Sequence, residues 1–141
     1  MDRRDWLLAA IATAGDRGLT PIQIQKAMFL LKKEAPDYVG ERFYDFVPYN
    51  YGPFSSVIYG DVDGLVFAGA VLESPSGRYS VYRATESGQE RAAASLERID
   101  KRARQYLETM VSWVSNVDFR QLLRSIYAKY PEYAEKSVFR T

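Results

Sequence analysis

The stretch GDVDG, at residues 60–64, holds the two carboxylates whose spacing most resembles a metal-binding or catalytic motif. A calcium loop of the EF-hand type needs a third oxygen ligand and then a glycine at its sixth position, but counting from Asp61 the fifth and sixth positions hold Leu65 and Val66. As a nuclease metal pair, Asp61 and Asp63 would point about 200° apart on a helix. No Glu-x-Lys sequence follows on a strand. We therefore expect no metal site here.

The rest of the composition also argues against an enzyme. The chain has 141 residues and contains neither histidine nor cysteine. This excludes disulfides, thiolate nucleophiles, Cys/His zinc sites and every mechanism with an imidazole base. Carboxylates, serine, lysine and tyrosine remain, but they form none of the clusters that an active site needs. We expect no catalytic residues, no cofactor and no metal, and a function that depends on binding.

Length and charge suggest an ordinary globular protein. The length suits one domain, 1–141, that can bury a real core, and 47% hydrophobic with 26% charged residues is usual. The net charge of +1 is much smaller than the positive charge that nucleic-acid-binding domains usually carry. Residues 1–15 faintly resemble an export signal, but Asp2 and Asp5 flank the arginines, so an amphipathic helix is favoured. No stretch approaches a membrane span, and we expect a cytoplasmic protein.

Local signals place the next elements. Thr20 is a good N-cap and Pro21 a good first helical residue, followed by apolar residues at helical spacing up to Leu31. Residues 42–52 favour extended structure but are interrupted by Pro48 and Gly52, which indicates a short strand or an ordered loop. A third helix is expected from Pro53 to residue 69. A hairpin is expected with strands at 71–74 and 78–83 and a turn at 75–77.

The C-terminal part reads as helical. Thr85 and Asp118 are good N-caps for two of its helices. Between them, apolar residues alternate spacings of three and four, as in the seam of a coiled coil. This predicted seam consists of Leu96, Ile99, Ala103, Tyr106, Met110 and Trp113. It would pair across a homodimer or pack on the last helix of its own chain, and we favour the homodimer because the last helix must also cover the body.

Three helices followed by a two-stranded hairpin are the layout of a winged helix-turn-helix. The sequence therefore predicts an α+β, mainly α fold. It would consist of a winged-helix core at 1–85 and a C-terminal helical extension at 86–141, within one domain.

Two short motifs, IQKAMFLL at 24–31 and YNYGPFS at 49–55, resemble the Panacea antitoxin family and the related uncharacterised YwgA-like prokaryotic proteins. The matching residues are Gln25, Lys26, Tyr51, Gly52 and Pro53, and the late segment YPEYAEKS at 130–137 is similar to a recurring ending in such proteins. The resemblance covers residues 19–72 and this tail. It implies a bacterial, archaeal or phage-borne binding module that neutralises or regulates a partner.

Six of the twenty aromatic residues fall between Phe43 and Phe54. They either brace the joint between strand and helix or present Tyr49, Tyr51 and Phe54 for binding, and packing is the commoner use of such residues. Gln25 and Lys26, polar residues on a largely apolar helix, either hydrogen-bond this loop or face water. The candidate partner-binding residues are Tyr49, Tyr51, Phe54, Tyr59 and Asp63.

The charge of the third helix favours a protein partner over DNA. In a helix-turn-helix this helix enters the major groove. Here it carries Asp61 and Asp63 and no cation, and no Lys or Arg occurs in residues 43–77, so it would repel phosphates. We expect a toxin or effector protein as the partner, blocked sterically. The alternative is a DNA-binding transcriptional regulator whose nucleic-acid contacts would be Arg78, Arg83, Arg98, Lys101 and Arg102.

Overall fold

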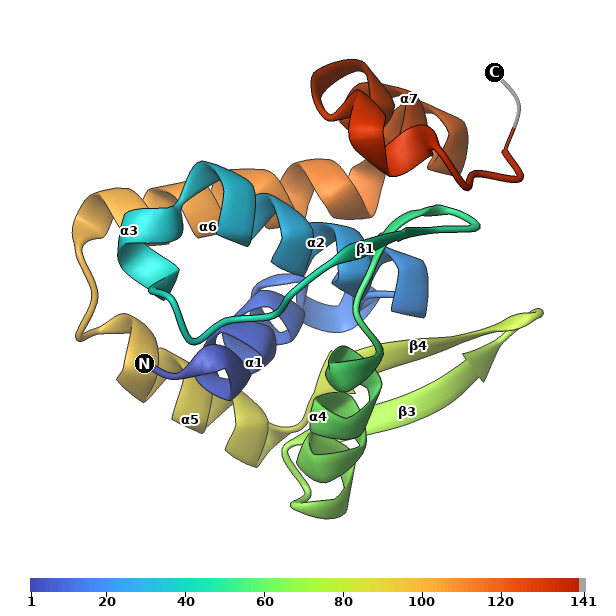
Figure 1. The fold of residues 1–141 in the computed structure, drawn as a ribbon. Helices are drawn as coiled ribbons and strands as arrows, with labels where there is room; N and C mark the ends of the chain where they lie inside the picture. Colours follow the sequence, from blue (N-terminus) through green and yellow to red (C-terminus); the bar gives the residue numbers. More distant parts are fainter. Residues whose placement is uncertain (140–141) are drawn as a thin grey trace.

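The computed structural model describes residues 1–139 as an α+β fold that is mostly helical and has two small antiparallel sheets (Figure 1). In chain order its elements are α1 (Arg3–Thr13), η1 (Gly15–Arg17), α2 (Pro21–Glu34), α3 (Pro36–Val39), β1 (Val47–Tyr49), β2 (Gly52–Phe54), α4 (Ser56–Phe67), β3 (Val71–Ser76), β4 (Tyr79–Ala84), α5 (Glu86–Leu96), α6 (Lys101–Asn116), α7 (Phe119–Lys129) and η2 (Pro131–Ala134).

Side-chain caps set the starts of α2, α5 and α7 where the sequence predicts them. The Thr20 hydroxyl accepts from the Gln23 backbone N–H, while the Gln23 side chain accepts from the Thr20 backbone N–H, a reciprocal capping box. Thr85 accepts from the Gly88 N–H, and Asp118 accepts from the Gln121 N–H at 2.8 Å. These caps satisfy backbone donors that a helix start otherwise leaves unpaired.

The hydrophobic core is centred on α1. Residues Trp6 to Ala12 are all buried, and α2, α4, α5, α6 and β4 contact this helix. In Figure 1 α1 lies in the middle of the molecule, between α2 and α5. One cluster of buried apolar residues runs from Trp6 to Ile126, so the N-terminal and C-terminal parts share a core. Within residues 1–139, no helix has the length and apolarity to cross a bilayer.

The aromatic-rich segment forms a small hairpin, which corrects one boundary. Tyr49 in β1 pairs with Gly52 in β2, and Pro48 pairs with Pro53. Gly52 has φ +90°, a left-handed conformation that side chains strongly disfavour. Pro53 therefore lies in a strand rather than opening the third helix. That helix, α4, begins at Ser56 after Ser55 at the N-cap.

The second hairpin is longer than predicted. Pro75 and Ser76, expected in the turn, belong to β3 and pair with Ser80 and Tyr79. The turn is made by residues 77–78, where Gly77 adopts φ +62°. Leu19, just before α2, adds a bridge to this sheet: it exchanges two backbone hydrogen bonds with Tyr82, at 3.0 and 2.8 Å.

The predicted seam is not one continuous helix. α5 ends at Leu96, and Asp100 caps a new helix by accepting from the Arg102 N–H at 2.6 Å, which leaves Ile99 in the break. Ala103 and Met110 are buried in the chain's own core, where α6 packs on α1 and α2.

Of the remaining seam residues, Leu96, Ile99 and Tyr106 are partly buried against the same core, whereas Trp113 is exposed. The Tyr106 hydroxyl bonds Glu34 at 3.0 Å, and Trp113 stays 38% exposed. The prediction that the seam joins two copies is therefore wrong for Ala103 and Met110, because their side chains are already buried within their own chain. A homodimer formed in another way stays a prediction.

The C-terminal segment returns to the first hairpin. The Val138 N–H donates to the Asn50 carbonyl at 2.9 Å, and the Tyr127 hydroxyl donates to Ser137 Oγ at 2.6 Å. Upstream, Tyr133 packs edge-on against Phe29 with ring centroids 4.7 Å apart. This segment therefore fixes the hairpin tip against α7.

Candidate functional site

The joint between β2 and α4 is held by two polar side chains of α2. The Gln25 side chain donates to the Ser55 carbonyl and accepts from the Ser55 N–H, each at 2.9 Å. The Lys26 ammonium donates to the Pro53 carbonyl at 3.1 Å. Both side chains are only 2% exposed. Of the two alternatives left by the sequence, hydrogen bonding to this loop is confirmed.

Burial of Lys26 has an electrostatic consequence. Removal from water disfavours the charged ammonium and lowers the pKa of Lys26 to about 7. Gly52 packs close by, since a Cβ there would lie 3.2 Å from the Tyr127 ring and 3.7 Å from Lys26 Cε. The Gln-Lys and Tyr-Gly-Pro motifs thus meet in one buried contact that shapes the hairpin.

Three of the predicted binding residues come together on the surface. Tyr49 stacks on Phe54 with centroids 4.8 Å apart, and Phe54 lies 5.7 Å from Tyr59. Tyr49 is 50% exposed and Tyr59 44%, so the rings brace the joint and also present an open surface. Asp63 is exposed one turn after Tyr59 on α4, and Phe67, 95% exposed, follows one turn later.

We call the set Tyr49, Phe54, Tyr59, Asp63 and Phe67 the aromatic face. It spans the first hairpin and the outer side of α4. Gly60 and Gly64 lie on the same helix, and no atom of another element lies within 4 Å of where their Cβ would be. The outer side of α4 is therefore smooth, with the apolar rings of Tyr59 and Phe67 on either side of the exposed Asp63.

Tyr51 belongs to a different surface. Its ring lies 5.5 Å from that of Phe119, at the start of α7. The two hairpins extend toward the same side of the molecule, with the start of α2 between them (Figure 1). A groove of about 340 Å³ lies there, which we call the hairpin groove; it is lined by Thr20, Pro21, Ile22, Gln23, Tyr51, Tyr79, Val117, Phe119 and Leu122.

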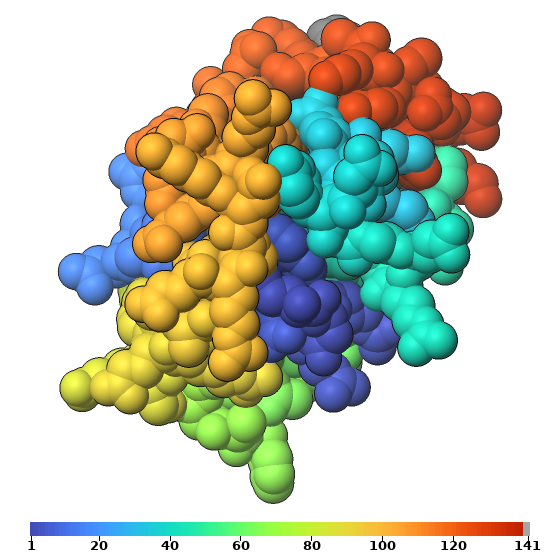
Figure 2. Space-filling model, turned by 90° about the vertical axis from the view of Figure 1, so that its left-hand side faces the viewer, coloured from blue at the N-terminus to red at the C-terminus, as the bar shows by residue number. Residues whose placement is uncertain are grey.

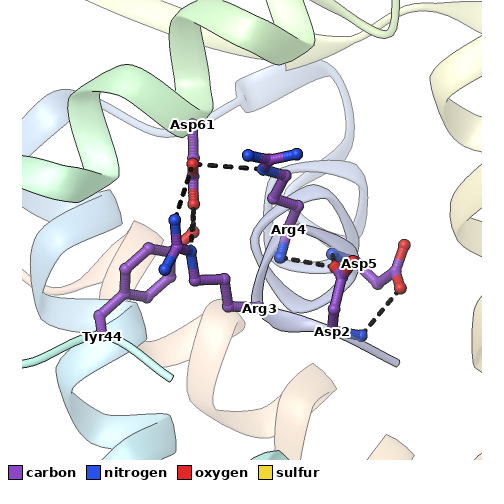
Figure 3. A network of polar contacts seen from close by, with 6 residues as sticks. All are labelled: Asp2, Arg3, Arg4, Asp5, Tyr44 and Asp61. Carbon is purple, nitrogen blue, oxygen red and sulfur yellow. Dashed lines mark hydrogen bonds and ion pairs between the residues drawn. The ribbon is translucent and has the colours of Figure 1, made fainter. Parts of the chain in front are cut away.

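Asp61 is not a surface charge. It is 6% exposed and accepts from the Tyr44 hydroxyl at 2.6 Å, Arg3 Nε at 2.8 Å and Arg4 Nε at 3.3 Å (Figure 3). Burial alone would raise the pKa of Asp61, but hydrogen bonds from Arg3 and Tyr44 outweigh it and hold the pKa below its usual value. Burial and the Asp61 hydrogen bond raise the pKa of Tyr44.

This network corrects the charge that the sequence assigned to the third helix. Only Asp63 of the two aspartates remains exposed on α4, because Arg3 and Arg4 pair with Asp61. The signal was present in the sequence. Asp61 lies on the same helical stripe as the buried Ile58 and Leu65, and a carboxylate in that position needs a cation partner.

The structure does not gather the predicted nucleic-acid residues. Arg78 lies in the β3–β4 turn, and the Arg83 guanidinium donates to the Asp16 carbonyl at 2.6 Å. Arg98, Lys101 and Arg102 are exposed where α5 joins α6, on the side of the molecule away from the β3–β4 tip (Figure 1). Figure 2, turned to face that side, shows α5 and α6 in front. The two groups form no common basic surface.

Among residues 1–139, no three carboxylates gather in a way that would hold a metal ion. No family model matches the chain, and no significant match to it was found among curated proteins. The aromatic face and the hairpin groove are the two candidate binding surfaces of the chain.

Proposed function

We propose that this chain is a non-catalytic winged-helix binding module, antitoxin-like or regulatory, that covers a functional surface of a protein partner. The observation that carries the proposal is the aromatic face. Tyr49, Tyr59 and Phe67 expose large rings on two adjacent elements, and residues 43–77 contain no lysine or arginine. Aromatic residues are enriched where proteins bind one another, whereas DNA-binding surfaces need cations.

The topology supports the winged-helix part of the proposal. If the short α3 and the β1–β2 hairpin are taken as insertions between α2 and α4, the order is α1, the Leu19 bridge strand, α2, α4 and then the β3–β4 hairpin. This is the layout of three helices and a two-stranded wing, and the Leu19–Tyr82 pairing ties the wing to the start of α2. The inserted β1–β2 hairpin sits between the second and third helices of this layout and carries the aromatic residues.

The chemistry of the face supports a protein partner. Each helical glycine costs about 1 kcal/mol relative to alanine. Gly60 and Gly64 incur that cost without touching another part of the chain. Small residues let a second protein approach the α4 backbone closely, while Tyr59 and Phe67 beside them supply apolar anchors. Binding there would block the partner sterically and would need no chemistry.

A DNA-binding regulator remains the alternative, because pairing of Asp61 with Arg3 and Arg4 makes α4 less negative than its sequence. Salt dependence separates the two functions. Under our proposal, generic duplex DNA binds weakly at physiological salt. A plot of the logarithm of the affinity against the logarithm of the salt concentration then has a shallow slope, because few phosphates are contacted. Tight, site-specific binding with a steep salt slope would favour the regulator.

The direct test uses the protein encoded by the neighbouring gene as the partner, with both full chains purified. We expect Tyr59→Ser and Phe67→Ser each to weaken binding at least tenfold by titration calorimetry, corresponding to about 1.4 kcal/mol. The matched control is Val138→Ser, since Val138 is 58% exposed but lies in the C-terminal segment. If this partner binds all three variants as tightly as it binds the wild type, the aromatic face is not its binding surface.

A further inference from the structure

The outer edge of β4 carries backbone groups that nothing in the described chain pairs. Tyr82 exchanges both of its ladder hydrogen bonds with Leu19, so its N–H and C=O point away from β3. In an antiparallel strand this direction repeats every second residue. The N–H and C=O of Ser80 therefore point to the same side as those of Tyr82.

The strand that covers Tyr82 does not reach Ser80. After Leu19 the chain passes through Thr20, the N-cap, into α2 at Pro21. Within residues 1–139 no backbone hydrogen bond joins Ser80 to a residue outside its hairpin. A donor and an acceptor are thus left free on the edge, directly beyond the point where Leu19 ends.

The opposite edge of the same sheet is protected. Pro75 pairs with Ser80 across the ladder at a position where the two strands exchange no hydrogen bonds. Proline has no N–H, so it removes a donor from the outer edge of β3, a common way to prevent strand addition. α4 also contacts β3. The β4 edge is therefore the better site for a new strand, because Ser80 offers both a donor and an acceptor whereas Pro75 lacks the donor.

The open edge lies beside the hairpin groove. Tyr79, next to Ser80, lines this groove together with Thr20 and Pro21, and the rings of Tyr51 and Phe119 line it as well. Side chains of an added strand alternate between two faces. One face of such a strand would place its side chains among these rings, so backbone pairing and apolar contact would act together.

Two arginines are the sequence neighbours of residues that line the groove. Arg78 precedes Tyr79 in the turn, and Arg120 follows Phe119 on α7 with its guanidinium 5.9 Å from the Phe139 ring. Both are exposed, and neither forms an ion pair with any described residue. Asp118, between the lining residues Val117 and Phe119, is an acidic neighbour of the groove, but its carboxylate caps α7 by accepting from the Gln121 N–H. The charge beside this largely apolar groove is therefore positive on balance, which favours an occupant with acidic residues.

We propose that the hairpin groove binds an extended, acidic peptide segment of a protein partner, which adds to the free edge of β4 as an antiparallel strand. Its backbone pairs with Ser80, continuing the line of Leu19. Its apolar side chains lie among Tyr51, Tyr79 and Phe119, and its carboxylates face Arg78 and Arg120. This site is separate from the aromatic face and goes beyond the proposed function, which does not depend on it.

The probe is a phage-displayed library of random peptides selected on the immobilised full chain, followed by synthesis of the enriched peptide. We expect alternating apolar residues with Asp or Glu nearby. N-methylation of the peptide at the positions that face Ser80 should weaken binding at least tenfold, whereas methylation one residue away should not. This pattern is specific to backbone pairing along an edge.

Protein variants complete the test. Ser80→Pro removes the edge N–H without breaking a bond to β3 and should weaken peptide binding at least tenfold; Ser80→Ala, which loses only the hydroxyl, should bind normally. If melting shows that Ser80→Pro does not fold, the methylated peptides decide. The proposed peptide site in the hairpin groove would be wrong if no peptide is enriched, or if N-methylation of the peptide does not change its binding. It would also be wrong if Tyr59→Ser abolishes binding, and the aromatic face would then be the peptide site.

Discussion

The buried ammonium of Lys26 donates a hydrogen bond to the Pro53 carbonyl, 3.1 Å away, and thereby ties α2 to β2. With the pair of bonds between Gln25 and Ser55, it fixes the backbone that leads into α4. The position of the aromatic face thus depends on a side chain whose charge is costly to bury.

The first prediction is that stability rises with pH. Folding lowers the pKa of Lys26 to about 7, against an ordinary value of about 10.4, so the unfolded chain binds more protons between these limits. The contribution of Lys26 to the free energy of unfolding should therefore rise by roughly 3 kcal/mol from pH 7 to pH 9.5. Part of this rise is offset near pH 9.5, because tyrosines of the unfolded chain, with an ordinary pKa of about 10, begin to ionise there. Urea unfolding at a series of pH values measures it.

The matched variant is Lys26→Met, which keeps an apolar stem and has no titrating group. Its unfolding free energy should change much less over the same interval. Equal stability of the wild type at pH 7 and pH 9.5 would show that the ammonium is well solvated, contrary to its burial.

The second prediction concerns acid. The pKa of Asp61 is held below its usual value, so its stabilising effect is complete above about pH 4 and is lost as the pH falls through the folded pKa. Asp61→Asn should lower the unfolding free energy at pH 7 by about 1–3 kcal/mol. This is less than the roughly 3–5 kcal/mol for a fully buried pair, because Arg3 is partly exposed and Arg4 largely so.

Asp63→Asn, on the exposed side of the same helix, is the control and should change stability by under about 0.5 kcal/mol. Chemical denaturation at pH 7 and pH 3 compares the variants. An Asp61→Asn protein as stable as Asp63→Asn at pH 7 would argue against the network of Figure 3.

The third prediction concerns Gly52. Its φ of +90° makes valine strained there, and the Tyr127 ring, 3.2 Å from where a Cβ would lie, makes it crowded. Gly40→Val is the control, because Gly40 has φ +78° but open space. Gly40→Val should cost about 1–2 kcal/mol from backbone strain, and Gly52→Val about 1–3 kcal/mol more from overpacking. Thermal melts decide, and equal melting temperatures would mean that Tyr127 moves aside freely.

The fourth prediction separates stability from binding on α4. Gly60→Ala and Gly64→Ala should each raise the unfolding free energy by about 1 kcal/mol, since both positions are helical and open. Gly88→Ala should instead destabilise, because its Cβ would lie 2.0 Å from the Ala70 carbonyl oxygen. If the aromatic face binds a partner, the two α4 variants bind it more weakly despite being more stable. Destabilised α4 variants would mean that these glycines serve the fold.

Local chemistry explains what the sequence predicted well. Thr20, Thr85 and Asp118 cap helices through bonds to N–H groups three residues away, so these helix starts could be predicted from the local sequence. The apolar spacing that follows Pro21 likewise depends only on helical geometry. The pairing of Gln25 with Ser55 joins residues 30 apart. The polar character of Gln25 and Lys26 on an apolar helix left two alternatives open, bonding to this loop or exposure to water, and only the fold decides between them.

Errors arose where a distant partner decides the outcome. Asp61 looked like a surface charge because its partners, Arg3 and Arg4, lie 58 and 57 residues earlier in the chain. Pro53 looked like a helix start, but pairing with Pro48 holds it in a strand. The spacing from Leu96 to Trp113 resembled a coiled coil because α6 uses the same periodicity to pack on α2 within the chain.

The bond from the Val138 N–H to the Asn50 carbonyl also orders events during synthesis. A ribosome releases the N-terminal part of a chain first, and that part begins to fold while the rest is still being made. Asn50 and the tip around it emerge long before Ser137, 87 residues downstream, is translated. The hairpin groove, which needs Phe119 and Leu122 of α7, is therefore completed late, and a nascent chain that ends before α7 offers no finished groove to a partner.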